Sequence, residues 1–259
     1  MKKSKIAVLV AMVVVLAFSL AACGGSDKSS SDKTVYKVGT EPTFPPFDTT
    51  DEDQNIVGLD MDLIKAIGED QGFDVEFENL SFDGLIPALK AGNIDIVAAG
   101  MNKDDEDRQK EVDFSDSYYE SKLFVAVTED NTTIKSVEDL TPDMKVAAQT
   151  GTTGASKVLE LKDAGKIKEA VILDGLDTCM MKLINGDVSA VINDKPVTEA
   201  YMKKQPDKIK MVGEALNAEN YGFAVQKGNA ELVEKINNGL KNIKENGTYD
   251  KLVDEWFNK

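Results

Sequence analysis

The sequence of 259 residues contains no histidine. Histidine is the side chain that most often serves as a general base, and it is the commonest metal ligand in proteins. Its absence excludes a Ser-His or Cys-His nucleophile and a His-ligated zinc site. Many classes of enzyme are therefore disfavoured before any motif is considered, and we expect neither catalysis nor a cofactor.

Cysteine is nearly absent as well, occurring only at Cys23 and Cys179. A chain with so few cysteines has no disulfide framework. If Cys23 is modified, Cys179 has no partner within the chain. Because free cysteines are among the most buried residues, we expect Cys179 to be a thiol of the core.

Basic residues are outnumbered, with 30 Lys and Arg against 46 Asp and Glu and a net charge of −16. Such a chain is repelled by the phosphates of nucleic acid, which we exclude as a partner. The charge favours solubility and says little about the fold. After the first 23 residues, no apolar run approaches the length of a membrane-spanning helix.

The first 23 residues have the pattern of an export signal. Three lysines lie among the first five residues, a nearly unbroken apolar run covers residues 6–18, and the tetrapeptide LAAC ends at Cys23. This is typical of a bacterial lipoprotein, in which residues 1–22 are removed and Cys23 carries lipid. The alternative is a membrane anchor, but the apolar run is shorter than the roughly 20 residues that a spanning helix needs.

On this interpretation the mature chain has 237 residues and a net charge of −19. Residues 23–34 are small, polar and charged, which predicts a flexible tether. The chain then works outside the cytoplasm, held at the membrane by its lipid.

Strand and helix patterns alternate from residue 35 onward, which predicts an α/β fold with mostly parallel sheets covered by helices. The pattern forms two similar blocks, near residues 35–125 and 127–220, followed by two helices. In order, the expected elements are strand 35–39, helix 59–70, strand 75–77, helix 84–91, strand 94–99, strand 145–148, helix 154–163, strand 171–173, helix 178–184, strand 190–192, helix 196–204, and helices 231–244 and 249–257. Two such blocks suggest a cleft between them, and open α/β sheets bind ligands beyond the carboxyl ends of their strands.

Two aromatic residues follow strands of the first block. The loop after the first strand holds Glu41 and Phe44 among three prolines, which stiffen the loop and leave little entropy to lose on binding. Phe44 is suited to stack on a ligand, and Glu41 to meet a polar or cationic group. Phe82 is a candidate second wall. The alternative is that both aromatics pack in their own core.

The segment AAGMN also follows a strand, and it contains Gly100, Met101 and Asn102. Gly100 permits close approach of the backbone, and Asn102 offers both donors and an acceptor. Arg108, in a chain whose basic residues are mostly lysine, has the planar fork needed for a bidentate carboxylate clamp. An ion pair with the acidic residues at 104–107 is the competing interpretation.

Polar side chains follow two strands of the second block. Gln149 and Thr153 belong to the motif QTGTTG at the start of a helix, where free N–H groups attract anions. The motif lacks the Lys and Ser/Thr ending of a phosphate loop, so a carboxylate fits it better. N-capping is the alternative. Asp194 either caps a helix or pairs with a ligand ammonium group.

Taken together, these motifs make the chain from about Val35 to Phe257 resemble the amino-acid-binding proteins of ABC importers, solute-binding protein family 3. The segments that carry the resemblance are GTEPTFPPFD, GLDMDLIKAI, FDGLIPAL, IDIVAAGM, VDFSDSYY, QTGTTG, VINDKP and ENGTYDKLVDEWF. The resemblance implies a two-lobe, type II periplasmic-binding-protein fold with two hinge crossings, near residues 124–127 and 221–225. It implies one lobe from residues 35–125 and 222–259 and another from residues 126–221.

The resemblance also assigns roles. It implies that Arg108 grips the ligand carboxylate together with Thr153, and that Asp194 pairs with the ligand ammonium group. The segment from Gly100 through Met101 to Asn102 adds donors and acceptors. In the same way, Phe44 and Phe82 enclose the ligand side chain, and Glu41 and Gln149 set its selectivity.

Two departures from the family pattern concern this site. Asn102 stands where the family usually has Ser or Thr, and one extra residue separates Gly100 from Arg108. We place this insertion at residues 103–107.

The implied function is capture of a free polar amino acid by lobe closure and delivery to an ABC permease and its ATPase. The implied ligands include glutamine, arginine, lysine, cystine and histidine. We expect a monomer on the extracytoplasmic face of the cell membrane, as on a Gram-positive outer surface. The alternatives are a tethered amino-acid sensor and a catalytic member of the same fold.

Overall fold

The structure is a computed structural model that describes residues 33–258. Residues 34–258 belong to one compact unit with two β-sheets. The predicted signal peptide, Cys23 and nearly all of the predicted tether lie outside the described residues. Between residues 33 and 258, no helix is both long and apolar enough to cross a membrane.

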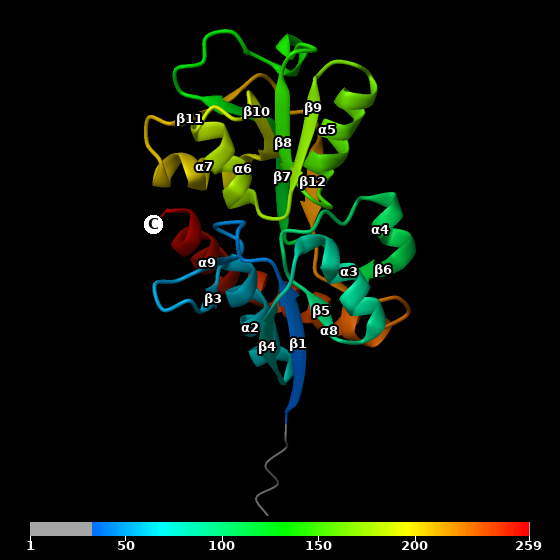
Figure 1. The fold of residues 1–259 in the computed structure, drawn as a ribbon. Coiled ribbons are helices and arrows are strands. Elements are labelled where there is room, and N and C mark those ends of the chain that lie inside the picture. The colour runs from blue at the N-terminus through cyan, green and yellow to red at the C-terminus, as the bar shows by residue number, and fades with distance from the viewer. Residues whose placement is uncertain (1–32, 259) are drawn as a thin grey trace, which may run out of the picture. The chain divides into compact units, whose positions relative to one another are not determined.

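The first sheet has the strand order β4-β1-β5-β13-β6 (Figure 1). Its strands are β1 (Thr34–Thr40), β4 (Phe73–Asn79), β5 (Ile96–Val97), β6 (Val112–Phe114) and β13 (Ala224–Gln226). β1 pairs in parallel with β4 and β5, whereas β13 pairs antiparallel with β5 and β6. A small antiparallel ladder joins β2 (Thr49–Thr50) and β3 (Ile56–Val57). We call the sheet that contains β1, together with its helices and this ladder, lobe 1.

The second sheet has the order β11-β7-β10-β8-β9, and β12 also pairs with β7. Its strands are β7 (Tyr119–Thr128), β8 (Lys145–Gln149), β9 (Glu169–Leu173), β10 (Ala190–Asp194), β11 (Ile209–Val212) and β12 (Ala218–Tyr221). β8 is parallel to β9 and β10, whereas β7 is antiparallel to β10, β11 and β12. We call this sheet and its helices lobe 2. Both sheets are therefore mixed, because the strands that carry the chain between lobes run antiparallel to their neighbours.

The first crossing between the lobes lies earlier than the sequence predicts. Phe124 and Val125 already pair with Asn193 and Ile192 inside the sheet of lobe 2, so the expected position at residues 124–127 is wrong. The chain leaves lobe 1 after β6 and enters β7, whose residues 119–122 pair with β12. The return passes from β12 to β13, within the expected segment. The two crossings thus form an antiparallel ribbon.

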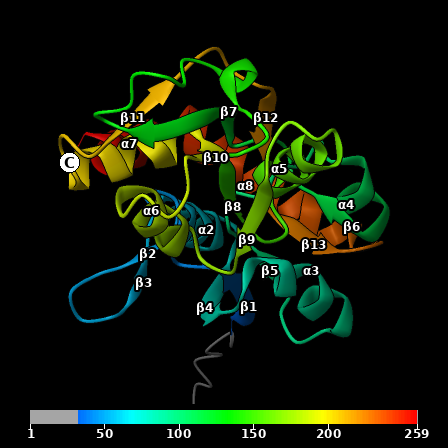
Figure 2. The same ribbon diagram turned by 45° about the horizontal axis from the view of Figure 1, so that its top comes forward.

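Helices cover both faces of each sheet (Figures 1 and 2). In lobe 1 they are α2 (Leu59–Gln71), α3 (Phe82–Ala91), α4 (Glu106–Glu111), α8 (Ala230–Glu245) and α9 (Thr248–Phe257). In lobe 2 they are α5 (Thr153–Asp163), α6 (Leu176–Ile184) and α7 (Lys195–Lys204), with a short 3₁₀ turn at Val137–Asp139. The expected elements are all present, with ends that differ by a few residues.

Alternating side chains explain the two-sided cover, because successive residues of a strand point to opposite faces. Ile96 packs in the cluster that contains α2, and the next residue, Val97, packs in the cluster that contains α3. In lobe 2, Val191 packs with α6 and Ile192 packs with α5. The near-continuous apolar strands of the sequence therefore bury both faces.

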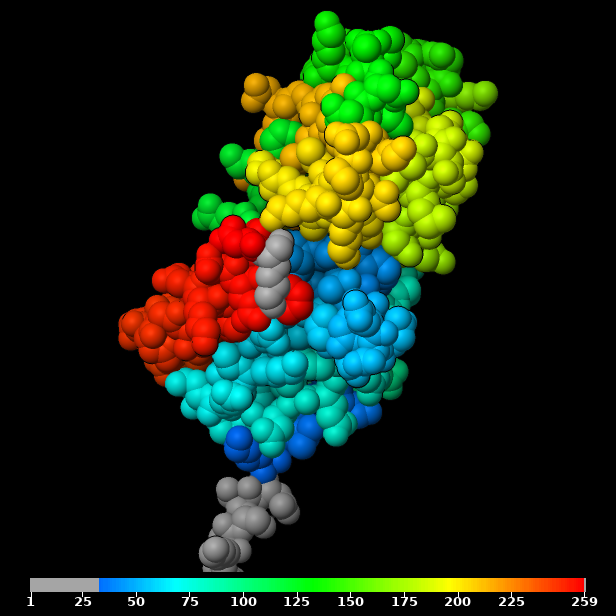
Figure 3. All heavy atoms as spheres, turned by 90° about the vertical axis from the view of Figure 1, so that its left-hand side faces the viewer, coloured from blue at the N-terminus to red at the C-terminus, as the bar shows by residue number. Residues whose placement is uncertain are grey.

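The C-terminal helix brings the ends of the two lobes together. Phe257 of α9 stacks on Tyr119 of β7, with ring centroids 5.2 Å apart, and its carbonyl accepts a 2.6 Å hydrogen bond from Lys203 of α7. Figure 3 shows the yellow surface of α7 next to the red surface of the C-terminal helix. Trp256 donates to Asp62 of α2, which ties α9 to lobe 1.

Candidate functional site

Nine of the ten residues predicted for the site line one cavity between the two lobes. The residues around this cavity are Glu41, Phe44, Phe82, Ala99, Gly100, Asn102, Arg108, Gln149, Thr152, Thr153, Asp194 and Glu219. The carboxyl ends of β1, β5, β8 and β10 meet here, as expected for α/β sheets. The cavity is narrow, at about 10 Å³, because side chains of the two lobes contact each other directly across it.

Met101 is the predicted residue that the structure does not bring to the cavity. Its side chain is 1% exposed and packs in the lobe 1 core with Leu85 and Leu89. The backbone bends at Gly100, where φ is +52°, and the side chain of Met101 enters this core, whereas Gly100 and Asn102 line the cavity. The prediction for Met101 is therefore corrected to a core residue.

Arg108, the only arginine of the sequence, reaches across the cavity from α4. It is 8% exposed, and its Nη1 and Nη2 donate to the carbonyls of Asn102 at 3.2 Å and Gly151 at 2.9 Å. Its guanidinium also lies 5.4 Å from the centre of the Phe82 ring, a cation–π distance. Burial lowers the pKa of Arg108, and the negative charge of Asp105 opposes that shift.

The competing ion pair of Arg108 with the acidic segment is absent. Within residues 33–258, none of the salt bridges involves Arg108. Asp105 instead caps α4 by accepting hydrogen bonds from the N–H groups of Asp107 and Arg108. The guanidinium is therefore directed at carbonyl oxygens, which a carboxylate can replace.

Asp194 ends β10 and begins α7, but its side chain does not cap that helix. Its Oδ1 accepts hydrogen bonds from Ser121 at 2.8 Å and Tyr221 at 2.5 Å. Burial raises the pKa of Asp194 well above its ordinary value, and the nearby charge of Glu219 raises it further. Burial of an ionised carboxylate is costly unless a cation pairs with it, so this site favours a ligand with a cationic group.

Gly100 is held in place by a buried acid below the cavity. Its N–H donates to Asp60 Oδ2 at 2.8 Å, and Tyr118 donates to the same oxygen at 2.7 Å. Gly100 has φ +52°, and a Cβ at this position would lie 2.8 Å from the Phe44 ring. Burial raises the pKa of Asp60 to about 7, against the two hydrogen bonds that lower it.

Glu41 and Gln149 meet across the cavity from opposite lobes. Gln149 Nε2 donates to Glu41 Oε2 at 2.7 Å and to the carbonyl of Asp174 at 3.0 Å. Thr43 also donates to Glu41. Burial raises the pKa of Glu41, and the hydrogen bonds from Thr43 and Gln149 lower it. This end of the cavity therefore presents a carboxylate and an amide.

The two aromatic residues flank the cavity differently. Phe44 is 7% exposed and packs against Phe47 and Tyr221, so it belongs both to the core and to the cavity wall. Phe82 is half-buried at the start of α3 and lies against Arg108. Phe44 therefore packs in the core of lobe 1 and also forms part of the cavity wall.

Sequence reasoning missed Ala99, Thr152 and Glu219, which also line the cavity. Thr152, rather than Thr153, is the N-cap of α5, because its Oγ1 accepts from the N–H of Ala155 at 3.1 Å. The repeated threonines of QTGTTG were the signal for it. Glu219 carries no local motif and is brought in by the pairing of β12 with β7.

With Arg108 and Asp194 in one cavity, the arrangement is suited to bind a molecule that carries both a negative and a positive group, rather than to hold a metal. Among residues 33–258, no group of three or more Cys, Asp or Glu side chains is placed to bind a metal ion. Cys179 is fully buried on α6, and burial raises the pKa of its thiol to about 12. It is a core thiol, as predicted.

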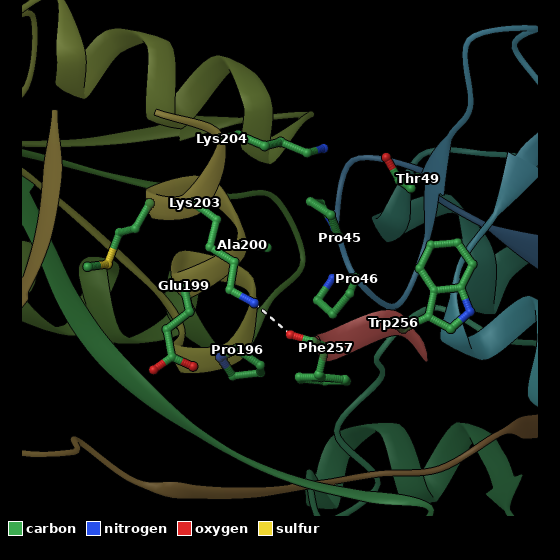
Figure 4. Close-up of a pocket in the computed structure, with 11 residues that line it drawn as sticks. Pro45, Pro46, Thr49, Pro196, Glu199, Ala200, Lys203, Lys204, Trp256 and Phe257 are labelled. Carbon is green, nitrogen blue, oxygen red and sulfur yellow. Dashed lines mark hydrogen bonds between the residues drawn. The ribbon is translucent and has the colours of Figure 1, made fainter. Parts of the chain in front are cut away.

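A wider groove lies elsewhere, between α7 and α9, with a volume of about 680 Å³ (Figure 4). Pro45, Pro46, Trp256 and Phe257 give it a mainly apolar wall, and Lys203 reaches across it to the Phe257 carbonyl. None of the residues predicted for the site lines it. The groove lies where α7 of lobe 2 meets α9 of lobe 1, whereas the side chains predicted for the site line the narrow cavity.

Two α/β lobes with a polar cavity between them, joined by a two-stranded crossing, define a two-lobe binding protein. Residues 36–259 match the family of bacterial extracellular solute-binding proteins, family 3, and the chain belongs to that family. The chain is 34% identical to a "Probable histidine-binding protein" of Neisseria gonorrhoeae, covering 94% of this chain and 92% of the relative. It is also 34% identical to a "Putative ABC transporter arginine-binding protein 2" of Escherichia coli, over the full length of both.

The solved structures agree with the fold. "An ancestral arginine-binding protein bound to arginine" superposes with a TM-score of 0.82 at 44% identity, covering 87% of this chain and 99% of that chain. The prediction of a two-lobe type II fold is confirmed.

Proposed function

We propose that this protein captures a free amino acid between its lobes and delivers it to an ABC importer. The observation that carries the proposal is the single cavity that holds both Arg108 and Asp194, each at least nine-tenths buried. The two charges suit the carboxylate and the ammonium group that every amino acid carries. The family and the names of its relatives support the same class of ligand.

Each charged group of the ligand has a suitable partner here. Arg108 clamps the carboxylate, helped by the N–H groups at the start of α5 near Thr153. Asp194 receives the ammonium group, with Gly100 and Asn102 beside it. Because an amino acid is costly to remove from water, both pairs must form in the same closed cavity.

Closure of the lobes follows from the position of these groups. Arg108 lies on lobe 1, whereas Asp194 and Thr153 lie on lobe 2. In the closed form described here, Arg108 donates to the Gly151 carbonyl and Gln149 donates to Glu41. Entry of a ligand requires these contacts to separate, and the ligand then replaces them. A ligand that bridges both lobes shifts the population towards the closed form.

The side-chain end of the cavity favours a cationic or amide ligand. Glu41 presents a carboxylate and Gln149 an amide, and among residues 33–258 no salt bridge neutralises Glu41. Arginine fits this pair best, because its guanidinium can donate to both side chains. Lysine, glutamine, histidine and cystine are the other candidates.

The proposal is tested by a thermal-shift screen of the twenty amino acids, cystine and ornithine, followed by calorimetry. A ligand that binds only the folded state raises its melting temperature. We expect arginine to give the largest shift, with an affinity near micromolar, worth about 8 kcal/mol. The absence of a shift with every compound would contradict the proposal.

Glu41→Gln tests the side-chain assignment. We expect this change to weaken arginine binding about tenfold or more, because it removes the charge that meets the guanidinium. Glutamine binding should change by less, since its amide carries no charge. Calorimetry with both amino acids on both proteins measures the difference. An equal loss for the two ligands would contradict the role of Glu41.

We also propose that residues 1–22 are a signal peptide and that lipid on Cys23 tethers a monomer to the outer face of the cell membrane. The motif before Cys23 and the extracellular family support this. One acyl chain binds a membrane only marginally, so two or more are needed. With the ligand site on a short tether, a high local concentration beside the permease replaces affinity for it.

Cys23→Ser tests the tether. We expect the variant to leave the membrane fraction and to lose incorporation of labelled palmitate, while it still binds the same amino acid. Cys179→Ser is the matched control and should remain in the membrane fraction. Retention of Cys23→Ser in the membrane would contradict lipid anchoring at this residue.

A further inference from the structure

Thr43 contacts both an acid of the cavity and the opposite lobe, although it does not itself line the cavity. It lies in the turn that follows β1 of lobe 1, where its N–H donates to the carbonyl of Glu41 at 2.8 Å. Its hydroxyl group donates to Glu41 Oε2, also at 2.8 Å. The turn therefore folds the Thr43 side chain back onto the acid and limits the rotation of that carboxylate.

The same hydroxyl group accepts a hydrogen bond from the opposite lobe. Leu176, the first residue of α6, donates its N–H to Thr43 Oγ1 at 3.1 Å. The first N–H groups of a helix have no partner within the helix, and Gly175, the N-cap residue of α6, has no side chain to supply one. Thr43 of lobe 1 therefore supplies an acceptor that α6 of lobe 2 lacks.

A second hydrogen bond from lobe 2 reaches the backbone of the same residue. Tyr201 of α7 donates its hydroxyl hydrogen to the Thr43 carbonyl at 3.0 Å. Burial raises the pKa of Tyr201 well above its ordinary value, so the hydroxyl group keeps its proton and remains a donor. Leu176 and Tyr201 thus hold Thr43 from two helices of lobe 2, and we call these three residues the Thr43 clasp.

The Thr43 clasp differs from the contacts between lobes that a ligand replaces. The hydrogen bond from Gln149 to Glu41 joins two residues of the cavity lining, so an entering ligand displaces it. None of the three clasp residues lines the cavity, so the clasp is compatible with a bound ligand. Contacts that exist only in the closed form shift the population towards that form.

We propose that Thr43 is a positioning residue that couples the ligand contact of Glu41 to closure of the lobes. Its hydroxyl group donates its one hydrogen to Glu41 and offers a lone pair to α6, so a single side chain orients the acid and fastens lobe 2. A ligand that meets Glu41 finds the carboxylate already directed, and its release requires the clasp to open. The identity of the ligand rests on the proposed function, whereas the clasp does not.

Thr43→Val tests the proposal, because valine keeps the shape of threonine and replaces only the hydroxyl group. Trp256, the only tryptophan of the sequence, lines the groove where α7 meets α9, so its fluorescence in stopped flow follows lobe opening. We expect the variant to release L-arginine about threefold to tenfold faster, as for the loss of one hydrogen bond. Calorimetry should show a larger loss of affinity for L-arginine than for L-glutamine, because the Glu41 carboxylate is no longer held.

Further variants separate the two roles of Thr43. Thr43→Ser keeps the hydroxyl group, so it should restore both the slow release and the preference for L-arginine. Tyr201→Phe removes one hydrogen bond of the clasp and leaves that of Thr43 to Glu41 in place, so it should speed the release of both amino acids equally. In a Glu41→Gln background, Thr43→Val should still speed release but should no longer change the preference.

Unchanged release in Thr43→Val, equal losses of affinity for the two amino acids, or no recovery in Thr43→Ser would overturn the proposal. Small-angle X-ray scattering tests the clasp without a ligand. Ligand-free Thr43→Val and Tyr201→Phe should be more expanded than the wild type, and equal radii of gyration would overturn the proposal. If neither amino acid binds the wild-type protein while both variants expand, the proposed ligand is wrong and the clasp stands.

Discussion

Replacement of Arg108 by Ala should lower the affinity for the amino acid by roughly 3–5 kcal/mol, which is a loss of at least a hundredfold. The reason is the burial of the ligand carboxylate. In the closed cavity it would lose its one cation, because Arg108 is the only basic residue among those that line the cavity. Calorimetry on the wild-type and variant proteins measures this loss.

Two further variants make the Arg108 result specific. Arg108→Lys keeps the charge but loses the planar fork, so it should recover only part of the affinity. Lys110→Ala lies on the same helix, where Lys110 pairs with Asp107 on the surface, and it should bind as the wild type does. Wild-type affinity in Arg108→Ala would reject the assignment of the carboxylate site.

Replacement of Asp60 by Ala should lower the free energy of unfolding by about 2–5 kcal/mol. The change leaves the N–H of Gly100 and the hydroxyl of Tyr118 buried without their shared acceptor. It also frees the segment at Gly100 that borders the cavity, so ligand affinity should fall too. Urea denaturation followed by circular dichroism measures the stability.

Asp60→Asn is the matched control, because its amide oxygen can accept the same two hydrogen bonds. It should lose much less stability than Asp60→Ala, and equal losses would contradict the hydrogen-bond argument.

Comparison of the wild-type protein with Asp60→Asn tests the titration of Asp60. Its pKa is about 7 in the folded protein, against an ordinary value of 3.8, so the folded state binds the proton more tightly than the unfolded state. Its contribution to stability is complete below about pH 4 and is lost as the pH rises to about 7, by at most about 1.4 kcal/mol per pH unit. Asp60→Asn should lack this slope, and parallel profiles for the two proteins would contradict the assignment.

The sequence alone predicted much of the fold for a local reason. Apolar runs such as residues 94–99 and 190–192, separated by helical patterns, specify strands that are buried on both faces. Gly and Asn signals such as Asn246-Gly247 specify where helices end, and α8 ends at Glu245. What these signals do not contain is strand direction at the crossings, so the mixed character of the sheets and the place of the first crossing appeared only in the structure.

The candidate site divides in the same way. Asp194 ends β10 and Gly100 lies shortly after β5, and the strand ends of a parallel α/β sheet converge at one edge. Arg108 lies farther along the chain, on α4, and its role was implied by the family resemblance. Met101 was misplaced because the sequence does not show which side chains of the segment 100–102 enter the core, and the core of lobe 1 takes up Met101.

The sequence by itself thus determined the class of this protein: an acidic chain without histidine whose polar residues gather at the ends of buried strands. Only the tertiary structure decided how those residues act on each other. It placed Glu219 and Asp194 in one cavity, Asp60 beneath Gly100, and Gln149 against Glu41, pairs that are 25 to 108 positions apart in the chain. Contacts over such separations depend on how the sheets pair and how the lobes close, and no local pattern of residues encodes them.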